Sequence, residues 1–406
     1  MGRVVLINSV LDSQLVYLMS SLPIPPGVIK QVDARRRLFM WGGTQGSTHA
    51  QCLVAWTNVC TTKDLGGLGT KDLGAQNICL LLKLIHRLHS AESSAWAHWV
   101  RQRASLSNLQ GDLHGHHWEI LRSLLPLYQA ITSVAIGNGN NTSFWYDVWS
   151  GDDSMADRFP ILFSHCIKKD ISVRAAVSSQ LHESFVTRLS PQAICELETI
   201  TTIIQSTILD ETEDQRLSPF SLGNGKLDTS GVYKLIKSQG CSSNPASDFI
   251  WESSAPPRVK FFVWLLLQGR IQCRHNLCKK TIVDSPICEV CNSEDETSEH
   301  IILRCGFTVA FWEAIGFSWS SDQSIGELYQ ATRPNNIPED QFETFIALCC
   351  WQLWKRRNGI VFRNEALNLQ QVLAACKVEA QLWRLRMPVP SRAVTNLWCH
   401  VFNNVM

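Results

Sequence analysis

The stretch that decides the fold is ICEVCNSEDETSEHIILRC, residues 287–305. It contains Cys288 and Cys291, separated by two residues, then His300 after eight residues and Cys305 after four more. Two cysteines three positions apart can bind one tetrahedral ion from a tight turn, and zinc accepts ligand sets of three sulfurs and one nitrogen. Since all four positions are filled by side chains, none is left for a catalytic water. The spacing therefore predicts one structural Zn²⁺ ion in a compact module.

Three further groups of residues are candidates for metal sites: Cys273, His275 and Cys278; His114, His116 and His117; Asp152 and Asp153. The first lacks the usual spacing of a zinc pair, and the second lies in a polar stretch without a carboxylate partner. The aspartate pair would suit a two-metal polymerase only with a further carboxylate on a neighbouring strand, and no hydrophobic strand follows it. We expect an ordinary structural role for the cysteine group, a polar loop or helix start for the histidines, and a solvated loop for the aspartates.

Composition narrows the class of protein. The chain has 406 residues, with 37 Lys and Arg against 36 Asp and Glu, and 45% of its residues are hydrophobic. This balance excludes a disordered chain and a strongly basic protein that wraps nucleic acid. The odd count of 15 cysteines, scattered along the chain, favours reduced thiols over a disulfide framework. We find no signal peptide and no apolar run near the ~20 residues of a membrane span, and expect an intracellular protein, nuclear or cytoplasmic.

The spacing of apolar residues and of turn residues predicts a mainly α fold with small β-hairpins. The compact zinc module lies toward the C-terminal half of this fold. Apolar residues recur every three or four positions over 4–18 and 78–88, as on one face of a helix. Residues 131–149 carry a Gly-Asn-Gly-Asn-Asn turn and predict a hairpin. We expect four parts: a helical region 1–130, a hairpin-containing connection 131–245, the zinc domain 246–320 and a helical C-terminal region 321–406.

Two basic clusters lie beside aromatic residues. The cations are Arg35, Arg36 and Arg37 near Trp41, and Lys355, Arg356 and Arg357 next to Trp354. Arginine with aromatic side chains suits contact with a nucleic-acid backbone and stacking on bases. The alternative is a solvated helix face over a Trp-rich core. We take the six cations as candidate contacts to RNA or DNA.

Several stretches resemble the region after the polymerase core in plant non-LTR (LINE-type) retrotransposon reverse transcriptases. They are GRVVLINSVLDSQLVYLMSSLPIP (2–25), AWTNVCTTKDLGGLGTKDLGAQN (55–77), VAIGNGNNTSFWYDVW (134–149) and IWESSAPPRVKFFVWLLLQGRI (250–271). The last, with the cysteine and histidine pattern after it, resembles the reverse-transcriptase zinc-binding domain. The resemblance covers most of residues 1–385.

The resemblance implies that Cys288, Cys291, His300 and Cys305 are the zinc ligands and that no catalytic residue carries over. The family's catalytic palm would precede Met1. We therefore expect a non-catalytic, retrotransposon-derived zinc-binding protein that binds RNA or DNA, without a small-molecule substrate or a membrane. One alternative is a reverse transcriptase fragment with residual polymerase activity. Another is a protein-interaction scaffold, with self-association through a face that the missing core would cover.

Overall fold

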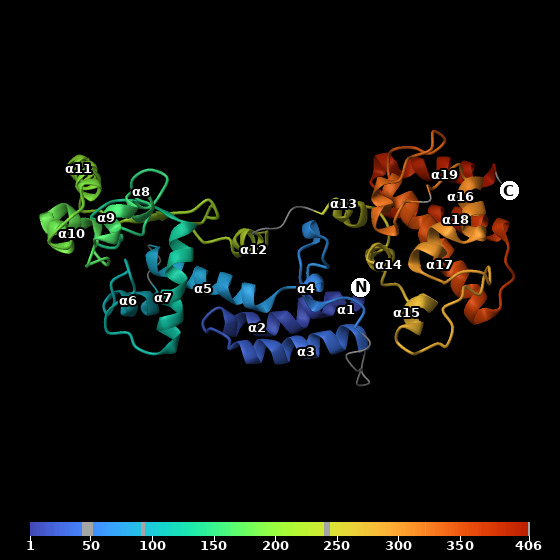
Figure 1. Cartoon of the computed structure of the whole chain (residues 1–406), viewed down its shortest axis with the longest axis horizontal. Helices are drawn as coiled ribbons and strands as arrows, with labels where there is room; N and C mark the ends of the chain where they lie inside the picture. The colour runs from blue at the N-terminus through green and yellow to red at the C-terminus, as the bar shows by residue number, and fades with distance from the viewer. Residues whose placement is uncertain (43–51, 91–93, 239–243, 321, 405–406) are drawn as a thin grey trace. The chain divides into compact units, whose positions relative to one another are not determined.

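The computed structural model describes residues 1–42, 52–90, 94–238, 244–320 and 322–404 (Figure 1). These residues form two compact units. The central unit contains residues 10–32 and 71–239, and the terminal unit contains residues 1–9, 33–70 and 240–406. The four-part division expected from the sequence remains a proposal. None of the helices in the described ranges has the length and apolar character to cross a membrane.

The central unit is mostly helical. Its elements are α2 (Asp12–Met19), α5 (Leu73–His89), α6 (Ala95–Arg101), α7 (His116–Ala130), β1 (Ser133–Ala135), α8 (Met155–Arg158), α9 (Pro160–Ser164), α10 (Val173–Ala175), η4 (Ala176–Gln180), η5 (His182–Ser184), α11 (Pro191–Ser206), β2 (Gln215–Leu217) and α12 (Thr229–Ser238). Helix α5 begins where the Asp72 carboxylate accepts a hydrogen bond from the Ala75 N–H at 3.1 Å. Its apolar face packs with α6, α7 and α12 in one core cluster. A second cluster surrounds the buried Phe144 and Trp145.

The prediction of a mainly α fold is confirmed. The hairpin expected within 131–149 is wrong, because β1 pairs with a strand outside that range. Strand β1 pairs antiparallel with β2, with Val134 opposite Arg216. The turn after β1 wraps around the carboxylate of Asp214, which accepts hydrogen bonds from the backbone N–H groups of Gly137 and Gly139 at 2.9 and 2.8 Å. Arg216 also forms a buried bidentate ion pair with Asp147 at 2.7–2.8 Å. These distant partners hold the segment in place of a local second strand.

The terminal unit holds the cysteine-rich stretch. Its elements are α1 (Gly2–Leu6), α4 (Trp56–Val59), η3 (Lys63–Leu65), α13 (Ala246–Trp251), α14 (Pro257–Leu267), α15 (Arg274–Cys278), η6 (His300–Arg304), α16 (Gly306–Ala314), η7 (Ile325–Gln330), α17 (Phe342–Arg363), α18 (Leu369–Trp383), η8 (Arg384–Arg386), η9 (Val389–Ala393) and α19 (Val394–Asn403). Two more, η1 (Ile7–Leu11) and α3 (Pro26–Gly42), contribute residues to both units.

The long helix α17 organises the core of the terminal unit. It packs against α14, α18 and η6. On its inward face the ring of Phe345 stacks on Phe402 of α19 at a centroid distance of 5.5 Å. Helix α14 begins with Pro257 at its first position, where the missing N–H of proline breaks no helical hydrogen bond. The contact between α17 and η6 places the core directly behind the cysteine and histidine cluster.

Candidate metal centre

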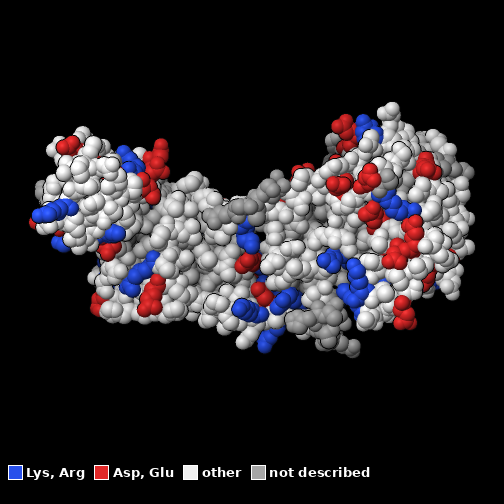
Figure 2. All heavy atoms as spheres, viewed as in Figure 1, with Lys and Arg blue, Asp and Glu red and all other residues white. Residues whose placement is uncertain are grey.

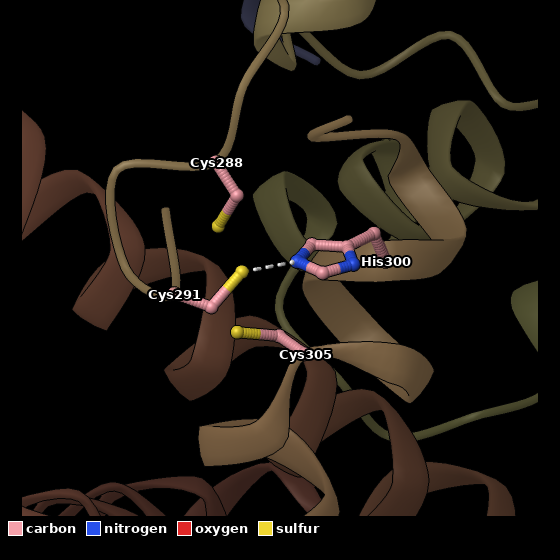
Figure 3. Close-up of side chains that lie close together, drawn as sticks. All are labelled: Cys288, Cys291, His300 and Cys305. Atoms are coloured by element: carbon pink, nitrogen blue, oxygen red, sulfur yellow. Dashed lines mark hydrogen bonds between the residues drawn. The ribbon is translucent and has the colours of Figure 1, made fainter. Parts of the chain in front are cut away.

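The first two cysteines lie on a tight turn. The Cys288 N–H donates to the Glu294 carbonyl at 2.8 Å, and the Asn292 N–H donates to the Cys288 carbonyl at 2.8 Å. Asn292 has φ +54°, a left-handed conformation that asparagine tolerates better than most residues. The Val290 N–H points at the Cys288 sulfur at 3.4 Å. The turn therefore directs the sulfurs of Cys288 and Cys291 to one side (Figure 3).

The other two candidate ligands lie at the ends of one π-helical turn. His300 begins η6, and the N–H of Cys305 donates to the His300 carbonyl five residues earlier at 2.8 Å. This wider turn brings two side chains five positions apart onto one face, and single π turns occur often at functional sites. The Glu294 carboxylate lies 3.0 Å from His300 Nδ1, so the other ring nitrogen, Nε2, faces the sulfurs.

The four side chains converge on one point (Figure 3). Their ligand atoms all lie within 4.8 Å of one another, and Cys291 Sγ is 3.3 Å from His300 Nε2. A tetrahedral zinc ion with Zn–S near ~2.3 Å and Zn–N near ~2.0 Å would hold these atoms roughly 3.5–3.8 Å apart. Cys288, His300 and Cys305 are buried, and Cys291 is half-buried. The donor set, spacing and burial fit a closed structural zinc site.

Hydrogen bonds within the cluster shift the pKa values of its side chains. The hydrogen bond with Cys305, together with burial, raises the pKa of the Cys288 thiol to about 12, and the same contact lowers the pKa of Cys305. The hydrogen bond with the Cys288 sulfur raises the pKa of His300 to about 9. Zinc binds thiolates and neutral imidazole, so metal binding must release these protons.

A buried ion pair ties the module to α17. Glu296 is fully buried, and Arg357 is 4% exposed. The guanidinium donates to both carboxylate oxygens, at 3.0 Å from Nε and 2.5 Å from Nη2. Glu296 also accepts the backbone N–H of Arg274 at 2.8 Å, so one carboxylate joins the zinc loop, α15 and α17. No sequence signal points to this contact, because a glutamate in a run of acidic residues looks solvated.

The predicted nucleic-acid contacts divide into buried and exposed groups. Three cations are buried and bonded to acidic partners: Arg36 to Asp33, Arg356 to Glu365, and Arg357 to Glu296. Their positions do not match the exposed contacts that the sequence suggested, because a guanidinium paired inside the fold is not available to a phosphate. Arg35 and Lys355 are exposed and Arg37 is half-buried.

The remaining candidate ligands lie apart. Cys273 is buried with its sulfur 4.0 Å from the Ser298 hydroxyl, whereas His275 contacts Asp295 at 3.3 Å. Asp152 and Asp153 are exposed in a loop. Within the described ranges, the Cys₃His cluster is the one group of three or more Cys, His, Asp or Glu side chains close enough to share an ion.

Comparison with known proteins agrees with this geometry. Residues 228–312, which include all four residues of the cluster, match the family described as zinc-binding in reverse transcriptase. The chain is 24% identical over 393 residues to an Arabidopsis thaliana protein named as a ribonuclease H protein, an alignment covering 89% of this chain and 60% of that protein. It is 28% identical over 145 residues to an uncharacterized mitochondrial protein of Arabidopsis thaliana, covering 34% of this chain and 94% of that protein.

The fold and the cluster together define a mainly helical protein whose C-terminal half carries a Cys₃His group that could hold a metal ion. Residues 228–312 are a reverse-transcriptase zinc-binding domain, and the resemblance to plant retrotransposon proteins is confirmed. The match begins just before α12, upstream of the domain start at 246 expected from the sequence. The chain spans 60% of the length of its relative named for ribonuclease H.

Proposed function

We propose that this is a non-catalytic, retrotransposon-derived protein that holds one structural zinc ion and binds RNA or DNA. The observation that carries the proposal is the closed Cys₃His cluster, in which side chains supply all four ligands. A catalytic zinc site keeps one position for water or substrate, whereas a structural site does not. Zinc here stabilises the fold that presents the rest of the surface to nucleic acid.

Nucleic-acid binding is supported by the family of the zinc domain, which belongs to enzymes that copy a template. The mixed charges of the surface favour contacts between individual side chains and nucleic acid over attraction by one large positive patch. On the face drawn in Figure 2, lysines and arginines lie among aspartates and glutamates. The formal net charge of +1 agrees with this mixture. Arg35, Arg37 and Lys355 remain proposed contacts, together with cations elsewhere on the chain.

Binding is tested with the full zinc-loaded chain and fluorescently labelled single-stranded RNA and DNA, by anisotropy. We expect binding whose affinity falls as salt rises from about 50 to about 200 mM, with a slope of about −0.7 in log K against log salt for each phosphate contacted. No binding at the lowest salt, or binding that ignores salt, would overturn the proposal.

The alternative of residual reverse transcriptase activity has a direct test. Primer extension on a homopolymer template should give no incorporation with the wild-type chain. Incorporation that Asp152→Asn and Asp153→Asn abolish would establish a polymerase site and refute the non-catalytic assignment. Asp214→Asn serves as a control for general damage, because Asp214 holds a backbone turn.

A scaffold that associates with a second copy of itself is favoured by one observation in the central unit. Several large apolar side chains there are exposed, including Tyr17 at 82% and Leu22 at 49%. Val10, which is also exposed, lies seven positions before Tyr17, at the join of η1 and α2. Contiguous exposed apolar surface marks interaction sites.

A further inference from the structure

The terminal unit contains a cavity of about 610 Å³ that none of the four cluster residues lines. One wall is the connection between α13 and α14 (Figure 1), together with the start of α14, and the other runs from η8 to η9. Lys260, Arg386 and Arg392 line the cavity, together with Ser253 and Ser254. A volume of this size accommodates a group as large as a small ligand, for which sites measure roughly 300–1,000 Å³.

Both walls are fixed by contacts inside the terminal unit. The Ser254 N–H donates to the Thr344 hydroxyl of α17 at 2.8 Å. On the opposite wall Met387 is buried, and its carbonyl accepts a hydrogen bond from Arg392 Nε at 3.3 Å. The cavity is therefore formed before any ligand arrives.

The three cations of the cavity have no acidic partner. Within the described ranges, the exposed Arg386 side chain forms no hydrogen bond or ion pair. Arg392 donates to the Met387 carbonyl, and Lys260 donates to the Trp251 carbonyl at 2.7 Å, so each keeps further N–H groups for a ligand. Among the described residues that line the cavity, none is acidic.

Positive charge gathers at this place without compensation. Burial, together with the nearby charges of Lys63 and Arg386, lowers the pKa of Lys260. Lys260 is also the fourth residue of α14, near the positive end of the helix dipole, where a cation is disfavoured and an anion is favoured. An anion in the cavity relieves this repulsion, and an arginine fork matches the oxygens of a phosphate group.

The mouth of the cavity is open to solvent. Leu385 and Val389 line it and are 77% and 72% exposed. A site for a free small molecule buries most of its ligand. An open cavity instead suits one group of a longer chain that passes across the surface, as a phosphate of a nucleic-acid backbone does.

We propose that this cavity binds a phosphate group of a nucleic-acid backbone, through Lys260, Arg386 and Arg392. The inference rests on the proposed function and gives it a location that the sequence did not suggest. Free phosphate compounds share the same chemistry, and an acidic protein segment is attracted by the same charges. The measurements that follow separate these ligands.

The test compares two double variants of the full zinc-loaded chain by anisotropy with labelled single-stranded RNA. The first, Arg386→Gln with Arg392→Gln, removes two cations from the cavity, whereas Lys260 is kept because it also bonds a backbone carbonyl of α13. The matched control, Arg270→Gln with Lys279→Gln, removes two charges from exposed positions of the same unit outside the cavity.

For each phosphate that the cavity no longer neutralises, we expect the cavity variant to bind roughly fivefold more weakly at about 100 mM salt, with a salt slope less steep by about 0.7. The control should bind nearly as the wild-type chain does. If the wild-type chain binds RNA and the two variants weaken equally, the cavity assignment is wrong while nucleic-acid binding stands. If the wild-type chain binds neither RNA nor DNA, the proposed function fails and the inference fails with it.

Inorganic phosphate and an acidic peptide separate the other ligands. Thermal unfolding is followed in inorganic phosphate against chloride at matched ionic strength, and anisotropy is repeated with a labelled peptide that alternates glutamate and leucine. Stabilisation by phosphate that only the cavity variant loses, without RNA binding, would overturn the nucleic-acid source. Peptide binding that depends on Arg386 and Arg392, where RNA binding does not, would overturn it in favour of an acidic protein segment in contact with Leu385 and Val389.

Discussion

Replacing Glu296 with leucine should destabilise the terminal unit more than any exposed substitution. Glu296 is fully buried and receives three hydrogen bonds, two from the Arg357 guanidinium and one from the Arg274 backbone. Glu296→Leu leaves the Arg357 charge buried without its partner. Breaking a buried pair in this way costs about 3–5 kcal/mol. The change is measured as a shift of the urea midpoint for the zinc-loaded protein, with zinc release to a coloured chelator as a second signal.

A double-mutant cycle isolates the pair. Glu296→Leu combined with Arg357→Met removes both charges, so the remaining cost is mainly the unsatisfied Arg274 N–H, about 1–3 kcal/mol. The double variant should therefore be more stable than Glu296→Leu alone. The control is Glu299→Gln, which breaks a partly exposed pair with Arg304 and should cost no more than about 1 kcal/mol. If Glu296→Leu costs no more than the control, or the two single costs simply add, the pair does not join the module to α17 as described.

Three further predictions concern the central unit. Asp214→Ala should lower its free energy of unfolding by about 3 kcal/mol, because several backbone N–H groups of the turn lose their acceptor; an unchanged urea midpoint would refute this. Burial holds the pKa of His89 well below its usual value, so the unfolded chain takes up the proton first and stability falls as the pH drops below about 6.5. His89→Phe should flatten this loss, by up to about 2 kcal/mol at pH 5, in urea unfolding at several pH values; an unaltered slope would count against it. Tyr17→Lys should reduce any self-association seen by light scattering, and a wild-type chain that is already monodisperse as a monomer would exclude that interface.

The sequence predicted the zinc module because its information is local. Four ligands within 18 residues carry a recognisable spacing, and the structure brings them together. The prediction of a hairpin failed because the partners of this segment are distant in the sequence. The turn after β1 is held by Asp214 and the strand pairs with Arg216, both about 80 residues away. No local pattern around residues 131–149 contains those partners.

Which charged side chains are exposed could not be inferred from the sequence alone. Arg36, Arg356 and Arg357 look like surface cations in the sequence, but each is buried beside a carboxylate. Long-range pairing decides which charges reach solvent.

The most direct test of the zinc assignment is the zinc content of the purified full chain, measured by mass spectrometry. We predict one zinc ion per chain, lost in the double variant Cys288→Ser and Cys305→Ser together with the cooperative unfolding of the terminal unit. Cys278→Ser, which lies outside the cluster, should retain the ion. A folded wild-type chain without zinc, or a double variant that keeps it, would contradict the assignment of these side chains as a structural metal site.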